Sequence, residues 1–359
     1  MRWYTKILLW PLLAVNFLVA LLLIGCAYSP LIPVESMPLL SLSGLAMPFV
    51  LAANVAFLVV WAVLYRRFML VTLIAFGICV SQIRAFSPVN IARQNPPEES
   101  FKLMSYNILS SNLKISTANK DNPMVKYLIS SGADIICLQE FSFSALKKNK
   151  VDLFSDYPYK SYDVSKESDA SARFLGCMSK YPILSVENID FGTTSNGCAK
   201  YRIRHDDDTI VVYNCHLQSN NLNDENKTAY EQILTNPRTN LIGEGTKEIV
   251  KKLQASVVKR AAQIDAIIAD MQQETSPYII VCGDFNDSPI SYACNILSNT
   301  LTNAYTVSGN GPGFSYGRSK LYYRIDHIFC SSLFNVYDCT IDRSVNISDH
   351  YPILCSLEK

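Results

Sequence analysis

The sequence has 359 residues, enough for one large domain or two smaller ones. Its 32 Lys and Arg residues nearly balance its 31 Asp and Glu residues, so its formal net charge is +1. A near-neutral chain lacks the positive excess of an indiscriminate nucleic-acid binder, although a local basic groove remains open. Only six basic and three acidic residues lie in 1–100, which leaves 26 and 28 for 101–359. The first part is therefore typical of a membrane segment, and the second is typical of a soluble domain.

Long apolar runs occupy the first part. Residues 7–27 form a run of 21 without a charge and residues 44–65 a run of 22. Each is long enough to cross a hydrocarbon core of about 30 Å as a helix. A third run, 68–83, has 16 residues and is slightly short. We predict a membrane domain over 1–84 with three helices near these runs. A cleaved signal peptide is the alternative for the first run, and the second long run disfavours it.

The positive charges indicate an orientation. Arg2 and Lys6 precede the first run, Arg66 and Arg67 separate the second from the third, and 28–43 contains neither Lys nor Arg. Because positive loops stay cytoplasmic, three crossings place the large domain outside the cytoplasm. We predict a multi-pass protein of the cell (inner) membrane, with the lipid bilayer as a partner and no obligate protein partner. If the third run lies only in the interface, the large domain is cytoplasmic.

The eleven cysteines favour a different compartment. Nine of them follow residue 100, and none has a paired metal-binding spacing. Free buried cysteine behaves as a small hydrophobe, and five lie in apolar strand-like runs: Cys137, Cys215, Cys282, Cys330 and Cys355. Exported proteins generally use cysteines in pairs, which an odd number fits poorly. We give the charge distribution more weight than the cysteines.

The large domain begins after a polar linker at 85–100, whose three prolines continue neither helix nor strand. Amphipathic spacing predicts helices over 122–133, with Asn122 or Asp121 as its cap, and over 245–273. We expect strands at 101–109, 134–140, 174–184, 199–205, 209–217, 278–282, 322–331, 334–342 and 351–357. Many strands with few helices indicate an α/β domain over 101–359, built from two packed sheets flanked by helices.

Polar residues follow the ends of these strands: Asn107, Glu140, His216, Asp284, Asn286, Asp326, Asp349 and His350. Loops at one edge of a sheet commonly build a functional site. Each residue also has a structural interpretation. Asn107 can turn the chain, His216 can be a hydrogen-bonded core histidine, and Asp326 can pair with Arg324. Their joint occurrence favours one dispersed site.

These strings resemble the endonuclease/exonuclease/phosphatase superfamily. The resemblance is carried by "SYNI", "ICLQE", "GDFND", "RIDHIF" and "SDHYPI", which occur in that family's order. "GCMSKYPI" at 176–183, and Arg260 with Gln263 in the "KRAAQ" string, are similar to two further motifs of the family. The resemblance covers roughly 101–359. It implies a four-layer α/β/β/α sandwich of mostly antiparallel sheets and metal-dependent hydrolysis of phosphate esters.

The resemblance also implies roles for single residues. Glu140 is expected to bind Mg²⁺, with Mn²⁺ as an alternative, and Asn107 and Asp349 are expected beside it, directly or through water. Asp284 is expected to orient or deprotonate the attacking water. Asn286 is expected to hold that water or a phosphoryl oxygen.

The histidines complete the expected site. His216 and His350 can donate hydrogen bonds to the charge that develops on the phosphoryl group. Asp326 is expected to fix the tautomer of the His350 imidazole. His327 faces the other side of its strand by period-two alternation, so we interpret it as structural. Asp287 and Pro289 are expected only to turn the chain after Asp284 and Asn286.

The substrate is less defined than the chemistry. The chain has "RIDHIF" where inositol 5-phosphatases carry a "CDRIL"-like string, which disfavours that branch. A membrane tether favours a lipid phosphodiester, and an extracytoplasmic nuclease is the alternative. A third hypothesis, a non-catalytic tethered binding protein on the same fold, is disfavoured by the intact carboxylates and histidines. Residues 218–244 are a candidate lid or a solvated connector. Three aromatic residues either stack on substrate or only pack: Tyr316, Tyr322 and Tyr323.

Overall fold

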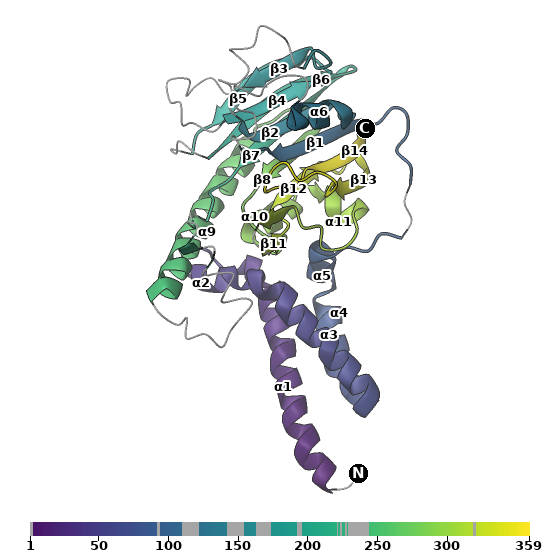
Figure 1. The fold of residues 1–359 in the computed structure, drawn as a ribbon, viewed down its shortest axis with the longest axis vertical. Coiled ribbons are helices and arrows are strands. Elements are labelled where there is room, and N and C mark those ends of the chain that lie inside the picture. Colours follow the sequence, from purple (N-terminus) through teal and green to yellow (C-terminus); the bar gives the residue numbers. More distant parts are fainter. Residues whose placement is uncertain are drawn as a thin grey trace.

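The computed structural model shows two packed sheets with helices on both outer faces, joined to an N-terminal bundle of helices (Figure 1). This architecture confirms the predicted fold class. The structure describes residues 3–91, 94–109, 122–141, 154–162, 174–191, 196–220, 222, 225, 226, 228, 244–318 and 321–359. Most of the predicted lid at 218–244 lies outside the described residues.

The first sheet has the strand order β13-β14-β1-β2-β4-β3. Its strands are β1 (Phe101–Asn107), β2 (Ile135–Phe141), β3 (Tyr159–Tyr162), β4 (Phe174–Ser179), β13 (Asn335–Ile341) and β14 (Ile353–Glu358). The β1–β2 pair is parallel, and the other pairs of this sheet are antiparallel. The ends of β1 and β2 therefore deliver Asn107 and Glu140 to the same edge.

The second sheet has the order β5-β6-β7-β8-β12-β9. Its strands are β5 (Ile183–Ile189), β6 (Gly197–His205), β7 (Asp208–His216), β8 (Ile279–Asp284), β9 (Thr302–Asn303) and β12 (Asp326–Cys330). Here β7 and β8 are parallel, which places His216 in register with Asp284. In the antiparallel β8–β12 pair, Asp326 lies opposite Asp284. A separate hairpin joins β10 (Tyr316–Arg318) to β11 (Leu321–Tyr323).

Two predicted strands are each divided in the structure. The run 174–184 becomes β4 and β5 in different sheets, because the Ser179 hydroxyl accepts the Tyr181 amide and Pro182 has no amide to continue the ladder. The run 322–331 becomes β11 and β12. There the Ser315 hydroxyl accepts the amides of Ile325 and Asp326, which takes them away from strand pairing.

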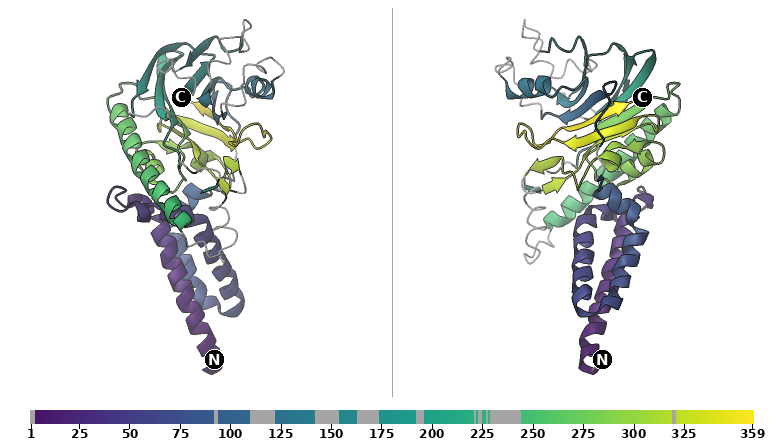
Figure 2. Two further views of the ribbon diagram at one scale, coloured as in Figure 1. Left: turned by 60° about the vertical axis from the view of Figure 1, so that its left-hand side comes forward. Right: turned by 90° about the vertical axis from the view of Figure 1, so that its right-hand side faces the viewer.

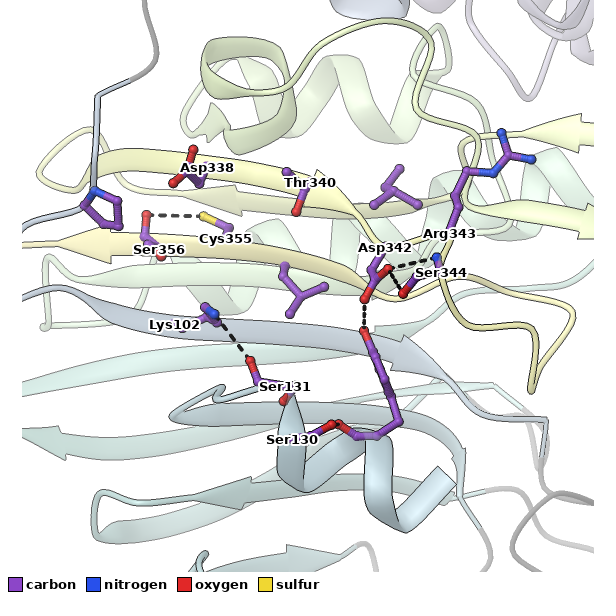
Figure 3. Close-up of a pocket in the computed structure, with 14 residues that line it drawn as sticks. Lys102, Ser130, Ser131, Asp338, Thr340, Asp342, Arg343, Ser344, Cys355 and Ser356 are labelled. Carbon is purple, nitrogen blue, oxygen red and sulfur yellow. Dashed lines mark hydrogen bonds between the residues drawn. The ribbon is translucent and has the colours of Figure 1, made fainter. Parts of the chain in front are cut away.

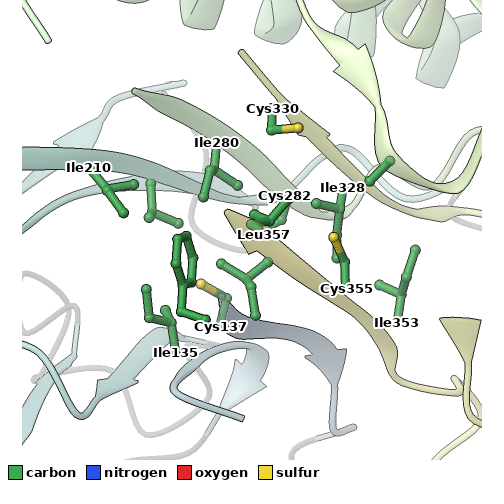
Figure 4. Packing of buried hydrophobic residues seen from close by; sticks show 14 of the residues in the cluster. Ile135, Cys137, Ile210, Ile280, Cys282, Ile328, Cys330, Ile353, Cys355 and Leu357 are labelled. Atoms are coloured by element: carbon green, nitrogen blue, oxygen red, sulfur yellow. The ribbon is translucent and has the colours of Figure 1, made fainter. Parts of the chain in front are cut away.

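The main core lies between the two sheets and contains the inward residues of both (Figure 4). Ile135 and Cys137 from the first sheet face Ile210, Ile280 and Cys282 from the second. All eleven cysteines are free and buried. Several therefore fill the core as small apolar side chains, as the sequence suggested.

Helices cover the outer faces of the sheets. The helix α6 (Pro123–Ser130) packs on the first sheet, and its Asn122 cap accepts the amides of Met124 and Val125. The helices α9 (Glu244–Met271) and α10 (Tyr292–Ser298) pack on the second sheet. A short helix, α11 (Ala304–Ser308), follows β9. The predicted helices 122–133 and 245–273 thus become α6 and α9.

The N-terminal bundle consists of α1 (Trp3–Ala27), α3 (Met47–Leu64), α4 (Met69–Ile78) and α5 (Val80–Phe86). Between α1 and α3 lie two 3₁₀ turns, Ser29–Leu31 and Leu42–Ala46, and the short α2 (Pro38–Ser41). A third 3₁₀ turn covers Arg66–Phe68. Two helical stretches of the described chain are long and apolar enough to cross a membrane, or three if the bent α4–α5 pair counts as one span.

The third predicted helix, 68–83, bends by 70° between α4 and α5. Cys79 has a non-helical backbone, with φ −97° and ψ 11°. The Tyr28 hydroxyl donates to the Ile78 carbonyl at 2.8 Å, a carbonyl that a straight helix would use internally. A hydrogen bond from Tyr28, just after α1, therefore takes the place of one intrahelical hydrogen bond at the bend.

Candidate functional site

Asp284 owes its position to the glycine before it. Gly283 has φ +137°, and a Cβ atom there would lie 2.0 Å from the Cys215 carbonyl oxygen. Only glycine allows β8 to approach β7 this closely. The Leu217 amide then donates to the Asp284 carbonyl at 2.9 Å, just beyond His216. Both side chains emerge at the same edge of the sheet.

Glu140 lies in an irregular part of β2. The β2–β4 register shifts between Leu138 and Phe141, and Glu140 has φ +52°. Bulges re-aim side chains next to functional sites, and a left-handed glutamate carries backbone strain. Asn286 has a similar φ of +51°, which asparagine tolerates more easily. The chain therefore maintains an unfavourable backbone conformation at Glu140, where its carboxylate joins the site.

Asn107 joins the two carboxylates. Its Nδ2 group donates to Asp284 Oδ2 at 3.0 Å and lies 3.4 Å from Glu140 Oε1. Its Oδ1 atom accepts the Leu109 amide at 3.1 Å and keeps a second lone pair. All three side chains are buried. The structure thus brings together residues that are separated by up to 177 positions in the chain.

The two histidines lie against the same carboxylates. His216 Nε2 is 3.7 Å from Asp284 Oδ2 and 3.9 Å from Glu140 Oε1. His350 Nε2 is 3.6 Å from Asp284 Oδ2, and its Nδ1 is 2.9 Å from Asp326 Oδ2. Asp326, which the sequence left free to pair with Arg324, instead contacts His350.

Burial and charge shift the pKa values of this group. Burial lowers the pKa of His350, but the charges of Asp326 and Asp284 outweigh it and raise that pKa to about 10. Burial raises the pKa of Asp284, and the charge of Asp326 adds to it, against the opposing effect of His350. At neutral pH, His350 is therefore an imidazolium, with Nδ1–H donating to Asp326 and Nε2–H facing Asp284.

The donor set fits a divalent cation. Glu140 supplies a buried carboxylate oxygen and Asn107 an amide oxygen that accepts the Leu109 amide and keeps a second lone pair, the hard ligands that Mg²⁺ prefers. Asp284, Asp326 and His350 also hold ligand atoms within 4.8 Å of one another. A metal between Asp326 and His350 would displace their hydrogen bond. Glu140 with Asn107 therefore fits a cation better than this trio does.

The two remaining predicted residues lie at the border of the site. Asn286 donates its backbone amide to Asp284 Oδ1 at 2.8 Å, while its Nδ2 donates to the Leu217 carbonyl at 3.0 Å. Asp349 is half-buried next to His350, and its Oδ1 lies 3.4 Å from the Ser348 hydroxyl. Ser348 in turn donates to the Asn107 carbonyl at 2.8 Å.

Asp287 does more than turn the chain, which corrects the sequence interpretation. Its Oδ1 accepts the Ser288 amide, as in a turn, but its Oδ2 accepts Arg260 Nε at 2.9 Å. Both partners of this ion pair are buried. Arg260 also donates to the Gln218 carbonyl at 3.0 Å. One α9 side chain therefore holds the loop after His216 and the loop after Asp284.

His327 lies on the other face of β12, where its ring packs between Phe285 and Phe329. Its Nε2–H donates to the Asp287 carbonyl at 3.1 Å. The Tyr316 ring stands edge-on to His350, with centroids 5.1 Å apart. The side chain of Tyr322 lies outside the described residues.

Sequence reasoning missed a polar bridge between the sheets. Gln139 Nε2 donates to Asn214 Oδ1 at 2.6 Å, and Asn214 Nδ2 donates to the Leu138 carbonyl at 3.0 Å. Period-two alternation was an available signal, because Asn214 precedes His216 by two residues on one strand. Ser315 was also missed, and its isolated position offered no pattern.

A groove of about 830 Å³ lies elsewhere, on the outer face of β13, β14 and β1 beside α6 (Figure 3). Lys102 reaches the Ser131 carbonyl there at 3.3 Å, and the Tyr127 hydroxyl donates to Asp342 at 2.8 Å. None of its lining residues belongs to the candidate site.

Comparisons with known proteins agree with this geometry. Residues 104–350 match the model of the endonuclease/exonuclease/phosphatase family, so the chain belongs to this family of phosphoesterases. Residues 5–86 match a domain of unknown function, DUF8431. No curated protein shows a significant match to the chain.

Solved structures share the fold at low identity. A family protein from Bacteroides thetaiotaomicron is 15% identical, with a TM-score of 0.52 over 74% of this chain and 98% of the other. A mannosyl-6-phosphatase from the same species is 16% identical, with a TM-score of 0.50 over 72% and 100%. A humanised form of TDP2 from D. rerio is 15% identical, with a TM-score of 0.50 over 73% and 100%.

Proposed function

We propose that this chain is a membrane-anchored, divalent-metal-dependent phosphoesterase that hydrolyses a phosphodiester or phosphomonoester with an activated water. One observation carries the proposal. Buried acids and histidines from separate strand ends lie within 4 Å of one another, at the edge where the family motifs meet.

The residues divide the chemistry among them. The raised pKa of Asp284 makes its carboxylate a stronger base, suited to accept a proton from water. Asn107 and the Asn286 amide orient that carboxylate by donating to its two oxygens. His350, held by Asp326, donates Nε2–H to a phosphoryl oxygen, and His216 donates from the other side. Asn286 turns its side-chain amide from the Leu217 carbonyl to the substrate.

A bound cation would supply the remaining electrostatics by neutralising charge on a phosphoryl oxygen. Glu140 and Asn107 would hold Mg²⁺ or Mn²⁺, with Asp349 beside them. The strained backbone of Glu140 is consistent with such a ligand, since strain of this kind concentrates at functional sites.

Variants of the full chain in detergent test this function. Asp284→Ala and His350→Ala are expected to lose metal-dependent hydrolysis of a generic phosphodiester by about 10²–10⁴-fold, while Tm is retained. Asp342→Ala is the matched control, because it removes a carboxylate that lines the groove of Figure 3, where it accepts the Tyr127 hydroxyl, and that does not contact the candidate site residues. Near-wild-type rates in either site variant, with the control active, would contradict the assignment.

The substrate class is tested by measuring hydrolysis of a panel of compounds: DNA, RNA, sphingomyelin, phosphatidylcholine and inositol phosphates. Anchoring in the bilayer favours a lipid phosphodiester, and preferential cleavage of nucleic acid would favour the nuclease alternative. For localisation we propose a multi-pass inner-membrane protein. In Figure 1 the N-terminus lies at the end of the bundle farthest from the catalytic domain. With a cytoplasmic N-terminus, Lys359 is expected to lie outside the cytoplasm. A reporter enzyme that folds only outside the cytoplasm should therefore be active when it is fused there.

A further inference from the structure

The chain between α1 and α3, residues 29–46, touches the catalytic domain beside the loop that follows Asp284. Gly44 lies so close to that loop that a Cβ atom on it would be 2.1 Å from the Ile290 carbonyl oxygen. The same atom would be 2.9 Å from Ser29 Oγ. We call residues 29–46 the support segment.

Ile290 shows that this contact is a buried one. It is 3% exposed and packs in one cluster with Leu23, Met47 and Cys79 of the N-terminal bundle. The residue stands only six positions after Asp284. The end of the candidate catalytic loop is therefore embedded in the bundle.

The support segment reaches the same loop by a second route, through α9. Val34 is buried against Val257 and Ala261 of α9. The neighbouring Arg260 is the residue that pairs with Asp287. Figure 2 shows from two sides that the N-terminal bundle meets the catalytic domain beside α9. The segment thus contacts the loop directly and also the helix that holds it.

A separate contact supports Asp326. Arg324, two residues earlier and 2% exposed, donates to the Ala85 carbonyl in the last turn of α5 and to the Pro312 carbonyl. Its guanidinium carbon lies 4.4 Å from the centroid of the Tyr305 ring. A hydrogen bond therefore joins α5 of the bundle to the residues just before β12.

We propose that the N-terminal bundle, which matches the domain of unknown function, is a positioning element of the phosphoesterase site and not only an anchor. Its three contacts reach the loop that follows β8, the helix that holds this loop, and the residues just before β12. The ends of β8 and β12 pair Asp284 with Asp326. Small misplacements of such groups cost large factors in rate. This inference rests on the proposed function, and it predicts that turnover depends on the fit between bundle and loop.

Gly44→Ala in the full chain in detergent is the decisive variant. We expect kcat on a soluble diester, bis(p-nitrophenyl) phosphate with Mn²⁺, to fall about 10- to 100-fold while KM changes less than about 2-fold. Faster amide hydrogen exchange in residues 285–298 is expected alongside. Gly77→Ala is the matched control, because a Cβ atom there meets nothing within 4 Å. It is expected to keep wild-type kcat and exchange.

A second pair of variants guards against misfolding. Ile290→Ala removes the side chain from the bundle without creating a clash and is expected to lower kcat, whereas Ile290→Val is expected to restore most of it. Unchanged kcat and unchanged exchange in both Gly44→Ala and Ile290→Ala would overturn the inference. If the wild type hydrolyses no phosphate ester, the proposed function fails, and the exchange comparison alone decides whether the bundle positions the loop.

Discussion

The N-terminal bundle and the catalytic edge both bury polar side chains, but they satisfy them differently. In the bundle, Trp61 Nε1 donates to Asn16 Oδ1 at 2.8 Å, and Asn16 Nδ2 donates to Thr72 Oγ1 at 3.1 Å. These groups are neutral, and their hydrogen bonds join α1, α3 and α4. At the catalytic edge the buried groups are ionisable: His350 Nδ1 is 2.9 Å from Asp326 Oδ2, and its Nε2 is 3.6 Å from Asp284 Oδ2.

This difference separates a structural network from a reactive one. Closed neutral hydrogen bonds stabilise a packed state and need nothing further. Buried ionised groups cost free energy in the folded protein even when they are paired, and a ligand of opposite charge can offset that cost. The comparison therefore predicts that variants of the Asn16 network lose stability and that edge variants lose activity or ligand response.

Asp326→Asn is expected to show the largest effect. The neutral amide leaves the His350 imidazolium without its closest counter-charge, so the pKa of His350 falls from about 10 toward its ordinary value of 6.5. Because a raised histidine pKa keeps the proton bound until pH exceeds it, wild-type kcat should hold through pH 8. The variant should lose activity as pH rises from 6 to 8, in addition to a loss of about 10²-fold at the optimum.

The pH profile of kcat measures this directly. A variant profile that parallels the wild type up to pH 9 would show that Asp326 does not set the protonation of His350. His350→Gln serves as the control, since glutamine does not titrate and its residual rate should not fall between pH 6 and pH 8.

Glu140→Gln addresses the ligand response. If Glu140 holds the cation, Mg²⁺ at about 100 times its Kd stabilises the wild type by about 2.7 kcal/mol, and the variant loses most of this. Tm with Mg²⁺ and with EDTA gives the measurement. In Asn16→Leu, the Tm in EDTA should be lower than that of the wild type, but Mg²⁺ should raise it by the same amount. If Mg²⁺ raises the Tm of Glu140→Gln as much as that of the wild type, then residues other than Glu140 bind the metal.

The sequence carried the local features of the site but not its tertiary support. Asn107, Glu140 and Asp284 could be proposed because apolar strands end at them, and parallel pairing brings such ends to one edge. The bulge at Glu140 depends on its pairing with β4, which no local pattern encodes. Gly44 begins the apolar run 44–65, and nothing in that run predicts a contact with Ile290. This contact arises only when distant segments of the chain pack together. Arg324 likewise contacts two backbone carbonyls and the Tyr305 ring, and not the Asp326 carboxylate that the sequence suggested.

Asn16→Leu is expected to have the smallest effect and tests the structural half of the comparison. Leucine removes the acceptor of Trp61 and the donor to Thr72, and polar contacts between membrane helices contribute about 0.6 to 2 kcal/mol. Tm in detergent should fall by a few degrees, about 2–4 °C per kcal/mol for a chain of this size, while kcat falls less than about 2-fold. Asn16→Gln, which keeps both polar functions, should restore part of the loss. A fall in kcat without a fall in Tm would mean that this network, too, acts on the reaction, through α1 and α3, which flank the support segment, and α4, which precedes α5.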